Sequence, residues 1–201
     1  IGLSDAKLLT VDLTNVQSQL GGRINYADSP LGQRSQLTAI KMFKAGDRIG
    51  VGTSSNDGRC NISTIEDDLA TNEKELSNII TFKAHKIEQA NHNILLYPAN
   101  SIGFHPHRGS GFVCTIGGEG KMHFWDANKR ERIVDFDFKG SPVTRAEIDP
   151  TGRFLAYSLG DDWSRGIQGY LSHPSKVCVH VLQDKELEKN YQGEQNYPLK
   201  Y

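Results

Sequence analysis

Short apolar or alternating runs, separated by turn-forming residues, follow one another along most of the chain. In the best-defined stretch these runs cover 101–104, 112–116, 121–125 and 132–136, and the segments between them carry Gly, Pro and Asn. Short runs of this kind, bounded by turn residues, are typical of β-strands. The pattern therefore predicts an all-β fold of short strands.

The pattern also repeats. Phe104-His105-Pro106 is followed about 44 residues later by Ile148-Asp149-Pro150, and VCTIG at 113–117 recurs as AYSLG at 156–160. A weaker copy at 49–54 has the same period once the polar residues 83–100 are set aside. Four strands in about 43 residues is the spacing of a β-propeller blade. A β-sandwich offers strands of similar length but no reason for this interval, so the repeat predicts a WD40-type β-propeller.

The period divides the chain into four parts. They are the end of one blade with a linker (1–36), a blade (37–82), a blade with a long leading loop at 83–100 (83–140), and a final blade with the C-terminal tail (141–201). Seven blades need about 300 residues, and blades bury their faces only between neighbours. The chain has 201 residues and starts with Ile1. We therefore expect the C-terminal part of a seven-bladed ring, about three blades plus the end of a fourth.

Composition limits the classes of function. Hydrophobic residues make up 37% and charged residues 23%, as in soluble globular proteins. No run is long enough for a membrane-spanning helix and no secretory leader is visible, so no membrane insertion is expected. The 23 basic residues nearly balance the 24 acidic ones, so contact with nucleic acid would need a local patch. Cys60, Cys114 and Cys178 lie in apolar runs, which predicts buried free thiols in a reducing compartment.

Catalytic and cofactor motifs are not found. The sequence contains no P-loop, no nucleophile elbow and no outstanding pair of carboxylates, so we expect neither an enzyme nor a cofactor. The glycines at 117–120 and at 21–22 are interpreted as hairpin turns. His105 and His107 flank Pro106, but no further ligands accompany them, and no metal site is expected.

Specific motifs identify a family. Trp125-Asp126 at the end of a strand is the general WD-repeat signature. Together with five further stretches, in this order, it resembles the Rae/Gle family of nuclear-pore mRNA-export propellers over essentially the whole chain, as the C-terminal half of such a protein. The stretches are SPL at 29–31, NDGR at 56–59, TFKAHK at 81–86, YPANSIGFHP at 97–106 and DWSRG at 162–166.

The last stretch, DWSRG at 162–166, is the most specific. The sister Bub-type spindle-checkpoint propellers are similar up to that point and typically lack it. Two departures stand out. The turn Gly118-Glu119-Gly120 replaces the usual Ser-Asp-Gly, and the insertion at 66–77 is longer and more acidic than in the family.

The resemblance implies a non-catalytic mRNA export factor at the nuclear pore complex of the nuclear envelope, able to shuttle to the cytoplasm. It implies that Arg59 binds a glutamate of the GLEBS segment of an FG nucleoporin, through a bidentate guanidinium–carboxylate contact. A second set is implied to line a groove for single-stranded RNA or for viral export-blocking proteins, with aromatic and guanidinium surfaces: Phe82, Trp125, Asp126 and Arg130. Trp163 and Arg165 are candidate loop contacts.

Each of these roles has a structural alternative. Arg59 is alternatively solvated or salt-bridged to its own turn, and Trp125 alternatively packs between blades and hydrogen-bonds through its indole N–H. His85 is expected to hydrogen-bond within a blade, and Trp163 alternatively anchors its loop by burying the ring. Four further cations would extend the groove or are ordinary surface charges: Lys83, Lys86, Lys129 and Arg132.

Two other functions also stay open. The first is a Bub-type spindle-checkpoint adaptor that docks GLEBS-like motifs at kinetochores, and it shares the expected role of Arg59. The second is a generic WD-repeat scaffold, such as a substrate receptor of a ubiquitin ligase.

Overall fold

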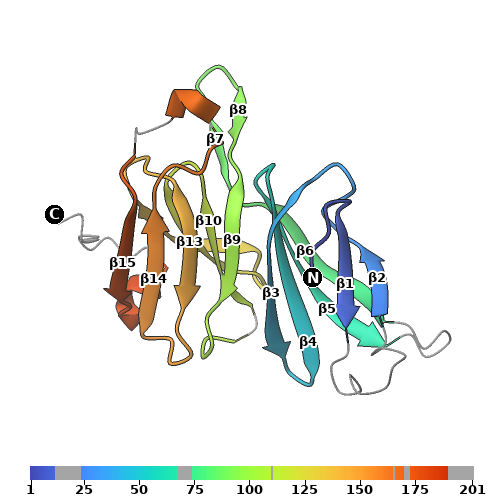
Figure 1. Cartoon of the computed structure of the whole chain (residues 1–201). Helices are drawn as coiled ribbons and strands as arrows, with labels where there is room; N and C mark the ends of the chain where they lie inside the picture. The colour runs from blue at the N-terminus through green and yellow to red at the C-terminus, as the bar shows by residue number, and fades with distance from the viewer. Residues whose placement is uncertain (12–23, 68–73, 110, 165, 170–172, 190–201) are drawn as a thin grey trace.

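The computed structural model describes residues 1–11, 24–67, 74–109, 111–164, 166–169 and 173–189 (Figure 1). These residues form antiparallel β-sheets and two short 3-10 helices, η1 (Gly166–Gly169) and η2 (Asp184–Leu187). The all-β class predicted from the alternating pattern is confirmed. Among the described residues, no helix has the length and apolar character that crossing a membrane requires.

Three sheets, here called blades A, B and C, follow one another along the chain. In each sheet every strand pairs antiparallel with the next in sequence. Blade A contains β3 (Leu37–Ala45), β4 (Arg48–Ser55), β5 (Arg59–Asp67) and β6 (Lys74–Lys83). Blade B contains β9 (Ala99–Phe104), β10 (Phe112–Gly117), β11 (Lys121–Asp126) and β12 (Glu131–Asp137), and blade C contains β13 (Val143–Ile148), β14 (Phe154–Leu159) and β15 (Lys176–Val181).

The blades are arranged side by side with their first strands facing one another. The central strand β9 contacts both β3 and β13, and Figure 1 shows these three strands together in the middle of the molecule. Consecutive antiparallel sheets that meet through their first strands form the fan of a propeller, and blade C has three described strands where blades A and B have four. The WD40-type propeller architecture expected from the period is confirmed, and the strands of blade B match the predicted runs to within two residues.

Apolar side chains fill the spaces between neighbouring blades. Between B and C the fully buried residues include Phe124, Phe136 and Phe138, and between A and B they include Cys60 and Ile62. Each strand supplies alternate residues to these layers because its side chains alternate between two faces. A blade is therefore stabilised mainly by its neighbours.

The cysteine prediction holds for two of the three residues. Cys60 and Cys114 are buried free thiols, and burial raises the pKa of both above the ordinary value. Cys178 is only half-buried.

Two small sheets lie outside the blades. β1 (Lys7–Val11) pairs with β2 (Ile24–Asp28) before blade A, and β7 (Lys86–Glu88) pairs with β8 (Ile94–Leu96) between blades A and B. The second sheet corrects the expectation of a plain leading loop over 83–100. Its strands have three residues each, too few for alternation to be recognised in the sequence, and the turn that joins them places His92 at φ 62°.

Candidate binding groove and rim

The four residues expected to form a groove meet in one small cavity. Phe82 near the end of β6 in blade A faces Trp125 and Asp126 at the end of β11 in blade B, and Arg130 follows in the β11–β12 turn. The cavity has a volume of about 40 Å³, and Ile80, Ala127 and Glu131 complete its lining. We call this cavity the aromatic groove.

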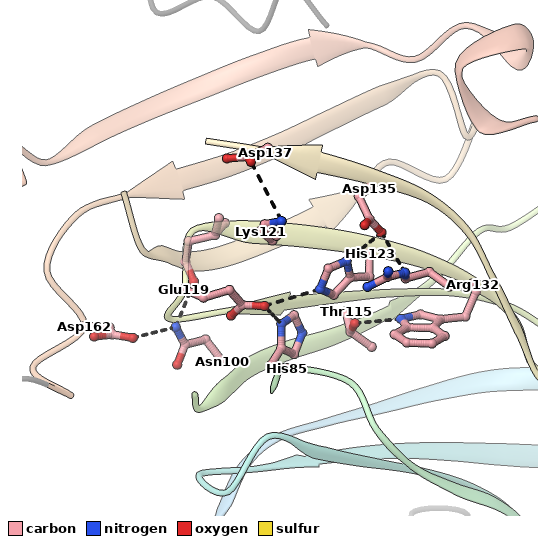
Figure 2. Close-up of polar contacts among 12 residues, drawn as sticks. His85, Asn100, Thr115, Glu119, Lys121, His123, Arg132, Asp135, Asp137 and Asp162 are labelled. Carbon is pink, nitrogen blue, oxygen red and sulfur yellow. Dashed lines mark hydrogen bonds and ion pairs between the residues drawn. The ribbon is translucent and has the colours of Figure 1, made fainter. Parts of the chain in front are cut away.

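Its wall consists of two aromatic rings from different blades. The ring centroids of Phe82 and Trp125 are 4.9 Å apart, and the rings are tilted by 56°. The Trp125 indole N–H donates to Thr115 Oγ1 over 2.9 Å, a bond drawn at Thr115 in Figure 2. Trp125 therefore satisfies its polar atom inside blade B and still presents its ring to the cavity, so both roles considered from the sequence are compatible.

Asp126 is held by its own turn. Its Oδ1 accepts the backbone N–H groups of Asn128 at 3.0 Å and Lys129 at 3.1 Å, and its Oδ2 lies 3.3 Å from Lys129 Nζ. Desolvation raises the pKa of Asp126, but the hydrogen bonds from Lys129 and Asn128 outweigh it and lower the pKa below the usual range. The carboxylate thus shapes the turn that carries Arg130.

Two arginines border the groove. Arg130 is exposed and adopts φ 57°, and Arg132 places its guanidinium carbon 5.9 Å from the centre of the Trp125 ring. Such a cation–π contact orients a guanidinium without removing it from solvent. Lys129 is paired with Asp126, and Lys86 is paired with Glu88 on the β7–β8 hairpin. Of the four additional cations, Arg132 has a cation–π contact with the aromatic wall.

Arg59 is the first residue of β5, directly after the β4–β5 turn, and is salt-bridged to that turn. Its Nε and one terminal nitrogen lie 2.7 and 2.6 Å from Asp57 Oδ2, and it also bonds to Ser35 Oγ. Desolvation raises the pKa of Asp57, but hydrogen bonds from Arg59 and Ser55 outweigh it and lower the pKa. The side chain of Arg59 remains 32% exposed. Its guanidinium is therefore held by these contacts and is still partly accessible at the edge of blade A that carries the β4–β5 turn.

A larger polar hollow lies beside this turn. We call it the rim hollow; its volume is about 530 Å³. Thr38 and Asn56 of blade A and Asp162 of blade C are among its lining residues. Asn100 Nδ2, also in the lining, donates to Asp162 Oδ2 over 3.1 Å (Figure 2). The full lining is Thr38, Asn56, Leu96, Tyr97, Pro98, Asn100, Asp162, Trp163 and Ser164.

Trp163 stands at the edge of the hollow. It is 61% exposed, adopts φ 61°, and its backbone N–H donates to Asp161 Oδ1 over 2.8 Å. The turn is therefore fixed by backbone and carboxylate contacts rather than by burial of the indole ring, which was the structural alternative. Arg165, the other loop residue named from the sequence, lies outside the described residues.

An apolar surface beside the hollow was not expected from the sequence analysis. The β7–β8 hairpin exposes Ile87 together with the successive residues Ile94, Leu95 and Leu96. Leu96 also lines the rim hollow. The signal that would have found this surface is the run Ile94-Leu95-Leu96-Tyr97 within an otherwise polar stretch.

A buried polar network lies behind the aromatic groove (Figure 2). Glu119 Oε1 is 2.6 Å from His85 Nδ1 and 3.3 Å from His123 Nε2, and His123 Nδ1 is 2.7 Å from Asp135 Oδ1. Arg132 Nε lies 3.2 Å from the same Asp135 oxygen. His85, in the segment between β6 and β7, thus bonds to the β10–β11 turn of blade B, whereas the sequence predicted a hydrogen bond within a blade.

The ionisation of this network follows from burial and pairing. Burial lowers the pKa of His85. Burial also opposes ionisation of Glu119, but hydrogen bonds from His123 and His85 outweigh it and hold the pKa of Glu119 at about 2. His123 loses some basicity through burial, yet its bonds to Asp135 and Glu119 raise its pKa overall. The two histidines on either side of the Glu119 carboxylate are therefore shifted in opposite directions, His85 to a lower pKa and His123 to a higher one.

A further large cavity is apolar, and the residues given as its lining include none of those predicted to form a site. It has a volume of about 260 Å³ and lies between the β1–β2 sheet and blade A. Leu8, Val11, Ile40, Met42 and Val51 are among its lining residues. It is a seam between two sheets rather than a polar binding site.

Comparison with protein-family models gave no match. Among curated proteins, the chain is 33% identical over 159 residues to "mRNA export factor GLE2" of Chaetomium thermophilum, which covers 78% of this chain and 41% of the relative. It is 31% identical over 163 residues to "Poly(A)+ RNA export protein" of Schizosaccharomyces pombe, a match that covers 81% of this chain and 43% of the relative. It is 32% identical over 149 residues to "mRNA export factor rae-1" of Caenorhabditis elegans, which covers 72% of this chain and 38% of the relative. The chain thus spans about two-fifths of the length of these relatives.

Solved structures support the fold alone. The crystal structure of Chaetomium thermophilum Raptor matches 91% of this chain and 14% of that chain, with a TM-score of 0.56 and 15% identity.

Proposed function

We propose, on the premise that the chain is a homologue of the Rae/Gle mRNA export factors, that it acts as a non-catalytic mRNA export factor at the nuclear pore. In this proposal the edge that carries Arg59 docks the GLEBS segment of an FG nucleoporin, and the aromatic groove contacts single-stranded RNA. The two surfaces are considered in turn.

The proposed RNA contact is supported by one main observation, which is that two blades contribute residues to the aromatic groove. Residues as far apart in sequence as Phe82 and Arg130 line the same cavity. Stacking of a base on an aromatic side chain contributes about 1–3 kcal/mol, and it tolerates any base because each has a π-face. The exposed Arg130 supplies the charge that a phosphate requires.

Arg130→Glu in the full-length protein tests this part. We expect the affinity for a fluorescent single-stranded oligouridylate to fall at least fivefold, because a phosphate partner is replaced by a like charge. Arg145→Glu is the matched control, since Arg145 is also exposed but lies on β13 of blade C. Fluorescence anisotropy measures both; equal losses in the two variants would contradict a groove-specific contact.

The nucleoporin part rests on the edge formed by the β4–β5 turn and the rim hollow. Arg59 is held in one orientation by Asp57 while remaining partly exposed. An arginine already ordered in this way loses less side-chain entropy when it meets a carboxylate. Trp163 and the hairpin residues Ile94–Leu96 add exposed apolar area next to the hollow, of the kind that peptide partners cover.

A pulldown of the full-length protein with an immobilised GLEBS peptide tests this part. Arg59→Glu is expected to abolish retention, whereas Arg48→Glu, at the other end of β4 and paired with the exposed Glu66, is expected to leave it intact. Failure of the unaltered protein to bind, or equal binding by Arg59→Glu, would refute the docking role. Preferential binding to a GLEBS-like kinetochore peptide would favour the spindle-checkpoint alternative.

A further inference from the structure

We propose that the rim hollow binds the side chain of a lysine or arginine in a peptide segment of another protein. The volume of the hollow, about 530 Å³, lies within the range of ligand-binding cavities. The inference goes beyond the proposed function, because it assigns a chemistry to the bound segment whichever protein supplies it. It also differs from the contact proposed for Arg59, which takes an acidic residue.

The first argument is the charge of the lining. Of the described residues that line the hollow, only Asp162 carries a formal charge. Its carboxylate accepts hydrogen bonds from Asn100 Nδ2 at 3.1 Å and from the Ser164 backbone N–H and hydroxyl at 3.1 and 2.6 Å (Figure 2). These donors orient the carboxylate but carry no charge to neutralise it. A hollow lined by one sign of charge attracts the opposite sign.

The neighbouring carboxylate adds to this negative potential. Asp161 Oδ1 accepts the backbone N–H of Trp163 at 2.8 Å, and Asp161 Oδ2 is buried without a hydrogen-bond partner among the described residues. Because Asp161 and Asp162 are adjacent in the chain, a cation in the hollow is attracted by both. A phosphate group would be repelled by both, so nucleic acid does not fit this hollow.

The second argument is the apolar part of the lining. Tyr97 follows β8 and Trp163 lies in the loop after β14, and both line the hollow together with Leu96 and Pro98. Lysine and arginine cover apolar surface with their methylene stems and keep the charged group in a polar position. Aromatic faces also attract such a cation. A long cationic side chain therefore matches both the apolar lining and the Asp162 carboxylate.

The third argument is the surface that continues from the hollow. The β7–β8 hairpin exposes Ile94, Leu95 and Leu96, and Leu96 also belongs to the lining. Trp163 is exposed as well. Contiguous exposed apolar residues of this kind mark surfaces that a partner covers. A peptide with its basic side chain in the hollow covers them with neighbouring residues, whereas a free cation does not.

The chain offers a matched pair of variants. Asp162→Asn removes the charge but keeps a side-chain oxygen for the Ser164 donors. Asp47→Asn is the control, because it changes the net charge equally on the exposed β3–β4 turn, at the opposite end of β4 from Asn56 of the hollow. Trp163→Ala removes an exposed ring, so it alters the hollow without removing a buried side chain.

The test uses the full-length protein and a library of short synthetic peptides, each with one fixed residue among random positions and none with a nucleoporin sequence. We expect the unaltered protein and Asp47→Asn to retain peptides with a fixed lysine or arginine at least threefold better than those with fixed norleucine or glutamate. Asp162→Asn should show no such preference, and Trp163→Ala a weaker one.

The peptide retained best then measures the contact directly by fluorescence anisotropy. Replacing its basic residue by norleucine keeps the stem and removes the charge. We expect this change to weaken binding at least fivefold with the unaltered protein and less than twofold with Asp162→Asn.

No preference of the unaltered protein for basic residues overturns the proposal. A preference that Asp162→Asn retains also overturns it, since the cation would then bind elsewhere. The nucleoporin docking role is decided separately, by the pulldown with the GLEBS peptide.

Discussion

At the scale of single residues, the polar atoms of the predicted binding residues are mostly occupied within the protein. Trp125 donates to Thr115, Asp126 caps its turn, and Arg59 is bonded to Asp57. What remains for a partner is an aromatic face, a partly exposed guanidinium and the exposed Arg130. The internal bonds order these surfaces, so a partner that binds them meets groups already in position.

The Trp125–Thr115 hydrogen bond is expected to stabilise blade B by about 1 kcal/mol. Trp125→Phe removes the donor and Thr115→Val the acceptor, so their effects on the free energy of unfolding should overlap rather than add. A double-mutant cycle in urea denaturation measures the coupling directly. Additivity within about 0.3 kcal/mol would show that the bond contributes little.

The Asp57–Arg59 pair predicts an acid-dependent contribution to stability. The folded-state pKa of Asp57 is lowered, so its contribution is present above the unfolded value of about 3.9 and is lost as pH falls through the lower folded pKa. Asp57→Asn should therefore lose less stability than the unaltered protein between about pH 5 and pH 2.

Denaturation midpoints across this range check the prediction. Asp47→Asn on the exposed β3–β4 turn is the control and should retain the steeper dependence. Parallel curves for Asp57→Asn and the unaltered protein would contradict the assignment.

At the scale of elements, the β4–β5 turn of blade A is hydrogen-bonded to the segment that follows β6. Gly58 accepts through its carbonyl from the backbone N–H groups of Ala84 at 2.8 Å and His85 at 3.1 Å. Its own φ is 76°, a region that favours glycine. This turn, which directly precedes Arg59, is thus fixed to the backbone that leads to the β7–β8 hairpin.

Gly58→Ala is expected to be strongly destabilising, by more than about 3 kcal/mol. An added Cβ would lie 2.5 Å from the His85 carbonyl oxygen and 2.7 Å from that of Tyr97, and both are backbone atoms that cannot move independently.

Gly46→Ala provides the comparison. Gly46 also has a positive φ, at 62°, but an added Cβ would meet nothing within 4 Å, so only the backbone cost of about 1–2 kcal/mol applies. Similar losses of unfolding free energy in the two variants would show that the close approach at Gly58 is relieved elsewhere.

At the scale of the whole molecule, the aromatic groove exists only because two blades pack together. One wall comes from β6 and the other from β11 and the turn that follows it. The net charge of the chain is −1, so attraction to RNA rests on the few cations beside this seam.

Local attraction of this kind should depend strongly on salt. The logarithm of the RNA association constant is expected to fall linearly with the logarithm of salt concentration, by about 0.7 for each phosphate neutralised on a single strand. Arg130→Ala should therefore reduce the slope by about 0.7, whereas Arg145→Ala should leave it unchanged. Anisotropy titrations at several salt concentrations measure the slopes, and an unchanged slope for Arg130→Ala would exclude a phosphate contact there.

The sequence by itself determined most of the strands and their grouping into blades. Alternation and turn residues are local signals that predict strands. Their period of about 44 residues places the ends of equivalent strands at the same edge of successive blades. Phe82 and Trp125 were expected in one groove through the resemblance to the Rae/Gle family, and in the structure their rings lie 4.9 Å apart.

Only the tertiary structure decided how the charged and exposed residues are used. It pairs Arg59 with Asp57, leaves Trp163 exposed, and brings Glu119 between His85 and His123. These outcomes depend on contacts between residues up to 34 positions apart. The free energy of a buried charge is set by which groups surround it after the blades pack, and no local pattern in the chain records that.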